Sequence, residues 1–146
     1  MNGYLLDTHV LIALLWPSHA HHARAVRWFT MHRSSGWATC PFTQAGFVRI
    51  VSNPAFSRDA VTPRDALSVL AANTASKDHV FWPDELPLAE AVAVAGSRLL
   101  GHQQVTDAYL LGMVLRRGGM LATLDERITA LAEPDSVQRR AVALIV

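Results

Sequence analysis

The sequence predicts an α/β fold with three layers, in which helices cover both faces of a central, mostly parallel sheet. Two observations predict it. Short apolar runs alternate along the chain with longer segments of helical periodicity, and those short runs are apolar almost throughout, as strands buried on both faces are. The 146 residues contain no repeat, low-complexity tract or linker. We therefore expect one domain over residues 1–146.

The first part of the chain has five segments that follow the two patterns. Residues 4–7 ("YLLD") and 37–40 ("WATC") are short apolar runs, which predict buried strands. Residues 8–15, 19–33 and 43–53 have apolar side chains at helical spacing. The first of these helices is expected to end at a Trp-Pro pair and the third at an Asn-Pro pair.

The middle of the chain contains the clearest helix start. Residues 61–76 begin with Thr62 as an N-cap, Pro63 in the first helical position and an acid in the first turn. Residues 79–82 ("HVFW") predict a third strand. Residues 88–100 predict a helix that ends at a glycine.

Four segments follow in the last part. A helix over residues 106–117 is expected to begin at Thr106 and to end at a Gly-Gly pair. Residues 120–125 ("MLATLD") predict a fourth strand and residues 126–133 a further helix. Residues 141–146 ("AVALIV") predict the last strand.

Composition restricts the class of protein. The net charge is +1, so the overall field of the molecule offers little attraction to a polyanion. No apolar run is long enough to cross a membrane, and the first residues lack the pattern of a secretory signal. The single cysteine, Cys40, agrees with a reducing compartment and with core packing. These features predict a cytoplasmic protein.

Three aspartates stand where parallel strands end or helices begin. Asp7 closes the first predicted strand, Asp125 closes the fourth, and Asp107 lies at the start of a helix. If the two strands are neighbours, all three carboxylates meet at one edge of the sheet. Gathered carboxylates repel one another unless a cation neutralises them, and oxygen ligands favour Mg²⁺ or Mn²⁺. Such an ion supports phosphodiester hydrolysis.

Each aspartate also has a purely structural explanation. Asp7 and Asp125 could cap the helices that follow them. Asp107 could be stabilised by the helix dipole in a first turn capped by Thr106. The joint placement of the three acids is therefore more informative than any one of them.

The segments "LLDTHVLIALL", "TQAGFVRIVSNP", "VTDAYLLGMVLRRGG" and "LATLDERI" resemble the ordered motifs of PIN-domain proteins, and in particular VapC toxins of toxin-antitoxin pairs. The resemblance implies a five-stranded parallel sheet, RNA cleavage that depends on Mg²⁺ or Mn²⁺, a homodimer, and inhibition by a cognate VapB-type antitoxin. It assigns the metal-binding and catalytic acids to Asp7, Asp107 and Asp125, and an assisting polar residue to Thr123.

Gln44 departs from the family pattern. The resemblance places a glutamate in the helix after the second strand, where this chain has "TQAGFVR". A glutamine carbonyl can act as a ligand but adds no negative charge, so a metal would bind less tightly. Gln44 is therefore expected to assist catalysis in a weaker site, or to be an ordinary polar residue of a helix surface.

Other polar side chains near these motifs allow two explanations each. His19 and His22 of "HAHH" share a helical face, but no further ligand stands at a known spacing, so an exposed first turn explains them better than a metal site. Arg49 could contact an RNA phosphate or pair with an acid of the cluster, and the second is favoured because buried carboxylates need partners.

The leading hypothesis is a metal-dependent endoribonuclease toxin. Its alternative is a PIN-fold module, weak or inactive because of Gln44, that binds RNA or protein. A phosphatase with Asp7 as nucleophile is set aside, because that chemistry needs a second acid two residues later, where His9 stands.

Overall fold

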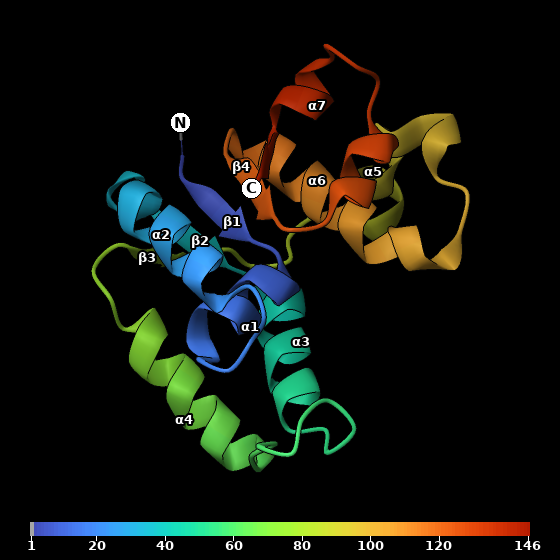
Figure 1. Ribbon diagram of the computed structural model, residues 1–146. Helices are drawn as coiled ribbons and strands as arrows, with labels where there is room; N and C mark the ends of the chain where they lie inside the picture. The colour runs from blue at the N-terminus through green and yellow to red at the C-terminus, as the bar shows by residue number, and fades with distance from the viewer. Residues whose placement is uncertain (1) are drawn as a thin grey trace.

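A computed structural model of the chain describes residues 2–146. Its sheet has five strands in the order β3-β2-β1-β4-β5, and all four neighbouring pairs are parallel (Figure 1). The strands are β1 (Tyr4–Leu6), β2 (Trp37–Thr39), β3 (His79–Phe81), β4 (Met120–Thr123) and β5 (Val142–Leu144). The predicted α/β class and the parallel sheet are confirmed.

Helices connect every pair of consecutive strands. The α-helices are α1 (Thr8–Leu15), α2 (His22–His32), α3 (Pro41–Val51), α4 (Pro63–Thr74), α5 (Leu88–Val92), α6 (Val105–Arg117) and α7 (Val137–Arg140). Short 3₁₀ helices are η1 (Arg33–Ser35), η2 (Ala93–Arg98), η3 (His102–Gln104) and η4 (Glu126–Leu131).

The two faces of the sheet bury separate apolar cores. Successive strand residues point to opposite faces, so Leu5 and Leu121 pack under α5 and α6, whereas Leu6 and Ala122 pack under α1 to α4. Figure 1 shows the first four helices on one side of the sheet and α5 to α7 on the other. These are the three layers that the sequence predicts.

Several helix boundaries differ from the prediction. The segment 19–33 is helical only from His22, and residues 19–21 form turns before α2. α3 begins two residues early, because Pro41 suits the first helical position and Thr43 Oγ1 accepts a hydrogen bond from the Cys40 N–H (3.0 Å). The predicted start of α4, with Thr62 capping the Asp65 N–H, is confirmed.

Three segments of the second half were predicted with the wrong type or missed. Residues 88–100 form only five residues of α-helix and then η2, because Gly96 adopts φ 53° and ψ −131°, which breaks the helical path. Residues 126–133 form the 3₁₀ helix η4 instead of an α-helix. The short helix α7 was not predicted.

The strand order reverses at β1. The chain builds β2 and β3 on one side of β1, crosses over through α5 and α6, and then adds β4 and β5 on the other side. The carboxyl ends of β1 and β4 therefore lie side by side at the switch point, where open α/β sheets bind their ligands. Among residues 2–146, no helix is long and apolar enough to cross a bilayer.

Candidate active site

Asp7 leaves the end of β1 with its carboxylate buried. The residue is 6% exposed, and its two oxygens accept hydrogen bonds from the Thr8 N–H (2.8 Å) and from Thr123 Oγ1 of β4 (2.9 Å). Asp7 is thus the N-cap of α1, as the capping explanation requires, and also a buried acid at the switch point. Burial raises the pKa of Asp7 despite these hydrogen bonds.

Thr123 links the two strand ends. Its hydroxyl accepts a hydrogen bond from the Asp125 N–H (3.0 Å) and donates its own hydrogen to Asp7. Because the side chain is fully buried, the hydroxyl has fixed partners on both sides. Thr123 therefore holds the Asp7 carboxylate against the turn that carries Asp125.

Asp125 is paired with a neighbouring arginine. Its carboxylate caps η4 through the Arg127 N–H (2.9 Å) and also binds the Arg127 guanidinium, with Oδ2 2.9 Å from Nη2. The hydrogen bonds from Arg127 lower the pKa of Asp125. Asp125 is therefore ionised and already has a cationic partner.

Asp107 has the most perturbed environment of the three acids. It lies in the first turn of α6, whose N-cap is Gln104 and not the predicted Thr106. Burial, and then the negative charges of Asp7 and Asp125, raise the pKa of Asp107 to about 7. Within the described residues, no donor forms a hydrogen bond with its carboxylate, so this acid is half-buried without a partner.

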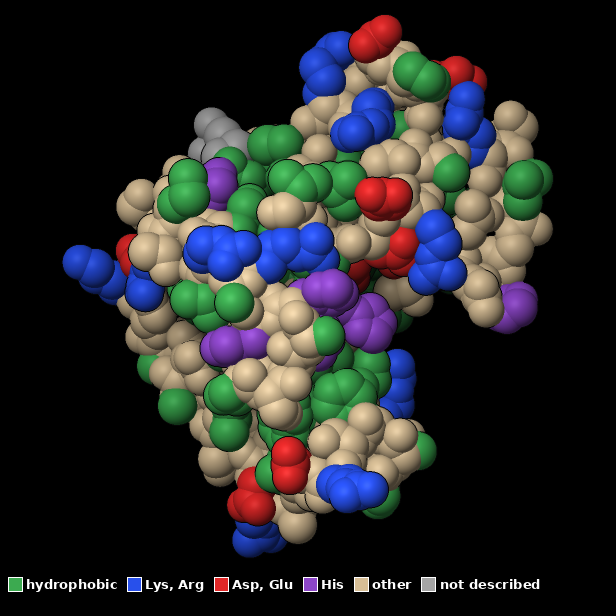
Figure 2. Space-filling model, viewed as in Figure 1, with side chains coloured by type: hydrophobic (Ala, Val, Ile, Leu, Met, Phe, Trp, Pro, Cys, Tyr) green, Lys and Arg blue, Asp and Glu red, His purple; other side chains and the backbone are tan. Residues whose placement is uncertain are grey.

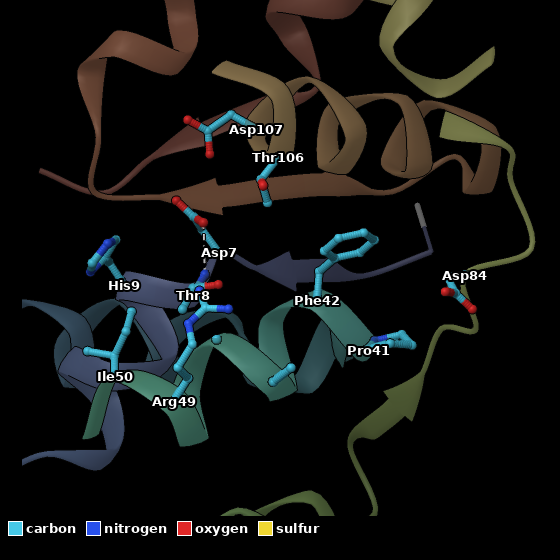
Figure 3. Close-up of a pocket in the computed structure, with 12 residues that line it drawn as sticks. Asp7, Thr8, His9, Pro41, Phe42, Arg49, Ile50, Asp84, Thr106 and Asp107 are labelled. Atoms are coloured by element: carbon cyan, nitrogen blue, oxygen red, sulfur yellow. Dashed lines mark hydrogen bonds between the residues drawn. The ribbon is translucent and has the colours of Figure 1, made fainter. Parts of the chain in front are cut away.

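Asp7 and Asp107 face one cavity of about 620 Å³ (Figure 3). Helix α3 closes its other side with Phe42, Ala45 and Arg49. The two carboxylates are hard oxygen ligands of the kind that Mg²⁺ and Mn²⁺ prefer. Nowhere in residues 2–146 do three or more His, Cys, Asp or Glu side chains form a group able to hold a metal ion. The structure thus gathers the acids at one edge while Asp125 remains bound to Arg127.

Gln44 does not reach this cavity. Its Nε2 donates a hydrogen bond to Thr39 Oγ1 at the end of β2 (2.9 Å), and the residue lines a neighbouring cavity between α3 and α4. The reason is helical geometry: positions 42, 45, 46 and 49 share the face of α3 that lines the cavity, and residue 44 does not lie in this row. The structure therefore does not support the expected role of Gln44 beside Asp7, and α3 contributes no acid to the cavity.

Four further residues of the site were not identified from the sequence. His9, Asp84 and Thr106 line the cavity, and Arg127 pairs with Asp125. The spacing of "DER" was a usable signal for Arg127, because a residue two positions after an N-cap acid often returns to it.

Arg49 lines the cavity and reaches toward Thr8 (Figure 3). None of the ion pairs found within residues 2–146 includes it, so the pairing expected from the sequence is absent there. Gly46 lets α3 approach α1 closely, since a Cβ there would lie 2.8 Å from Thr8 Cγ2.

Comparison with known proteins identifies similar chains. The model of the PIN domain family matches residues 4–134. Ribonuclease VapC39 of Mycobacterium tuberculosis is 46% identical over 134 residues, which cover 92% of this chain and 96% of the relative. Ribonuclease VapC38 of the same organism is 44% identical (88% and 89% covered), and Ribonuclease VapC44 is 36% identical (96% and 98% covered).

The environment of Asp107 predicts a pH-dependent stability. Its pKa is about 7 in the folded protein and about 4 when unfolded, so its contribution to stability is complete below pH 4 and is lost as the pH rises toward 7. Asp107→Asn removes this loss. At pH 8 we expect the metal-free variant to melt a few degrees above the metal-free wild type. This shift corresponds to a free energy of unfolding that is higher by about 1 kcal/mol, after allowance for solvent screening.

Differential scanning fluorimetry from pH 4 to pH 8 in the presence of a chelator measures this effect. The difference between variant and wild type should vanish near pH 4. Asp59→Asn, which changes an exposed aspartate, is the matched control and should shift the melting temperature little at any pH. A destabilised Asp107→Asn variant at pH 8 would contradict the prediction.

Proposed function

The chain belongs to the PIN-domain family, and from this premise we propose that it is a divalent-metal-dependent endoribonuclease, the toxin of a VapBC-type toxin-antitoxin pair. The ribonuclease relatives support the activity on RNA. The observation that carries the metal dependence is Asp107, an unpartnered carboxylate that shares one cavity with Asp7 and has its pKa raised to about 7.

Asp7 and Asp107 would hold Mg²⁺ or Mn²⁺, and Asp125 would join them by exchanging Arg127 for the ion or its waters. Asp7 and Asp107 both offer carboxylate oxygens to the cavity, and no basic group pairs with Asp107 within the described residues, which fits a hard cation. When bound, the ion supplies a water of lowered pKa and stabilises the charge that develops on the phosphate oxygens.

The side chains around the acids have distinct tasks in this proposal. Thr123 keeps the Asp7 carboxylate oriented toward the cavity by donating a hydrogen bond to Oδ2. Arg49 adds a positive charge on the opposite wall, where it can bind an RNA phosphate. Gln44 has no part in the reaction, because its amide binds Thr39.

The partners follow from the same family. We propose that a cognate VapB-type antitoxin inhibits the protein, that it forms a homodimer, and that it acts in the cytoplasm. Exposed apolar side chains on α4 and β3, including Leu67, Val80 and Phe81, provide surface for such contacts. An inactive PIN-fold module is the alternative, and Gln44 no longer favours it because its side chain lies outside the acid cavity.

Cleavage of RNA tests the proposed activity. Antitoxin-free protein should cut a single-stranded RNA in the presence of Mg²⁺ or Mn²⁺ and should stop when a chelator is added. Asp107→Asn should lower the rate by about 100-fold or more, because one of the two facing carboxylates is lost. Gel analysis of a labelled RNA measures both effects.

Asp59→Asn, purified in the same way, is the control and should cleave as fast as the wild type. Equal cleavage by the wild type and Asp107→Asn, or undiminished cleavage in excess chelator, would reject the metal-dependent mechanism.

The pairing of Asp125 with Arg127 makes a second prediction. Arg127→Gln frees the Asp125 carboxylate and removes a competing cation, so Mn²⁺ should bind about three to ten times more tightly at low ionic strength. Isothermal titration calorimetry measures the affinity. Arg98→Gln removes an equal charge from another ion pair, that with Glu133, and should leave it unchanged. Unchanged or weaker Mn²⁺ binding in Arg127→Gln would contradict a place for Asp125 in the metal centre.

Gln44→Glu distinguishes the geometry of this chain from the family pattern. The family pattern predicts that a carboxylate at position 44 tightens metal binding. Because this side chain binds Thr39 outside the cavity, we expect Mn²⁺ affinity to stay within about twofold of the wild type. The same calorimetric titration decides, and a clearly tighter affinity would show that residue 44 can reach the ion.

A further inference from the structure

One part of the chain contains no negative side chain. Between Asp7 and Asp59 there is no aspartate or glutamate, while the same stretch has five arginines and five histidines: Arg24, Arg27, Arg33, Arg49 and Arg58, and His9, His19, His21, His22 and His32. Although the net charge is only +1, the acidic side chains are therefore concentrated in other parts of the chain than this basic stretch. These arginines and histidines lie on α1, α2 and α3, in the segments between them and in the segment that follows α3.

The histidines between α1 and α2 form a connected group with Arg24. The backbone N–H of His21 donates a hydrogen bond to His19 Nδ1 (3.0 Å), and the centroids of the two rings lie 5.6 Å apart. Arg24 Nη2 lies 3.0 Å from His21 Nδ1. Because a guanidinium can only donate, His21 Nδ1 is the acceptor and its Nε2 carries a hydrogen. The exposed His21 ring is thus a hydrogen-bond donor beside a positive charge.

Arg24 and Arg27 continue this group along α2. They are three residues apart, so they are neighbours on the helix surface, and Arg27 is exposed. In the part of the chain that the structure describes, neither arginine takes part in an ion pair. Adjacent guanidinium groups without carboxylate partners suit phosphate oxygens, which they bind through paired hydrogen bonds.

This basic group adjoins the acids of the candidate active site. His9 lines the acid cavity with Asp7, and on the other side it lies close enough to His19 to contribute to the lowered pKa of that residue, after burial and His21. Figure 2 shows basic side chains over α2, then a group of histidines, and then the acidic side chains. A strand of nucleic acid that reaches the acids from this side would pass over the group.

We propose that His21, Arg24 and Arg27 form a binding surface for the phosphate backbone of single-stranded RNA and direct it toward Asp7 and Asp107. This inference rests on the proposed function and adds the path of the substrate. A transition-metal site on the histidines is not an alternative, because the described residues include no group of three suitable ligands. Binding through phosphates would be insensitive to base sequence and sensitive to salt.

The test measures RNA binding separately from cleavage. In the Asp107→Asn background with chelator, fluorescence anisotropy gives the affinity for a labelled single-stranded RNA at several salt concentrations. Arg24→Gln combined with Arg27→Gln should weaken binding about tenfold or more at low salt and lower the salt slope by about 1.4, or 0.7 for each lost phosphate contact. If the half-buried Arg24 is needed for folding, His21→Ala with Arg27→Gln tests the same surface.

The matched control removes two charges elsewhere. Arg64 and Lys77 are exposed, lie near opposite ends of α4 and are not on α2, so Arg64→Gln with Lys77→Gln should leave affinity and slope unchanged. Equal losses in both double variants would overturn the proposal, because only overall charge would matter.

Two further outcomes separate this proposal from the proposed function. If the α2 variants bind RNA like the parent while the wild type cleaves RNA, the surface is wrong and the ribonuclease stands. The surface would then fit an acidic protein partner better. If the wild type neither binds nor cleaves RNA, both proposals fail.

Discussion

The hydrogen bond from Thr123 to Asp7 is the interaction on which the site depends. It joins the ends of β1 and β4, which are the two strands at the switch point of the sheet. A buried carboxylate without donors would be costly, and here Thr123 and the Thr8 N–H supply two. Because Thr123 also binds the Asp125 N–H, one hydroxyl fixes the relation between two acids that are 118 positions apart in the chain.

The same arrangement makes ionised Asp107 unfavourable for stability. Burial, and then the charges of Asp7 and Asp125, raise the pKa of Asp107, so the folded protein resists ionisation of a group that ionises readily when unfolded. Only Asp125 has a compensating cation, and Arg127 is bound to it from an exposed position. Repulsion between neighbouring charges is typical of functional sites, where a protein loses some stability because its function requires those charges close together.

The sequence predicts the parts of this fold that depend on local signals. The strands β1 to β5 are short apolar runs, and the start of α4 carries a cap, a proline and an acid. It does not predict the break at Gly96 or the 3₁₀ form of η4, because both depend on backbone angles and packing that leave little trace in periodicity. Because parallel strand ends meet, the ends of β1 and β4 bring Asp7 close to the turn with Asp125, whereas Thr123 was expected from the resemblance and Asp107 from its place at a helix start. Gln44 was expected in the site from the family pattern, whereas its side chain binds Thr39 and does not line the cavity, a result of how α3 packs that its own residues do not signal.

Charge separation connects the acid cavity with the rest of the molecule. Arg127 pairs with Asp125, whereas Arg49 lines the opposite wall of the cavity and is in no ion pair among the described residues, so the protein neutralises only part of its own site. Under the proposed function, a divalent cation competes with Arg127 for the Asp125 carboxylate, while an RNA phosphate offers Arg127 and Arg49 an anion to bind. Cation and RNA would then favour each other's binding, because the cation binds the carboxylate that Arg127 releases and the RNA phosphate binds the released arginine. The stretch from residue 8 to residue 58 has no acid of its own, so it places further positive charge near these carboxylates. Under the proposed function, this charge attracts the phosphates of the RNA.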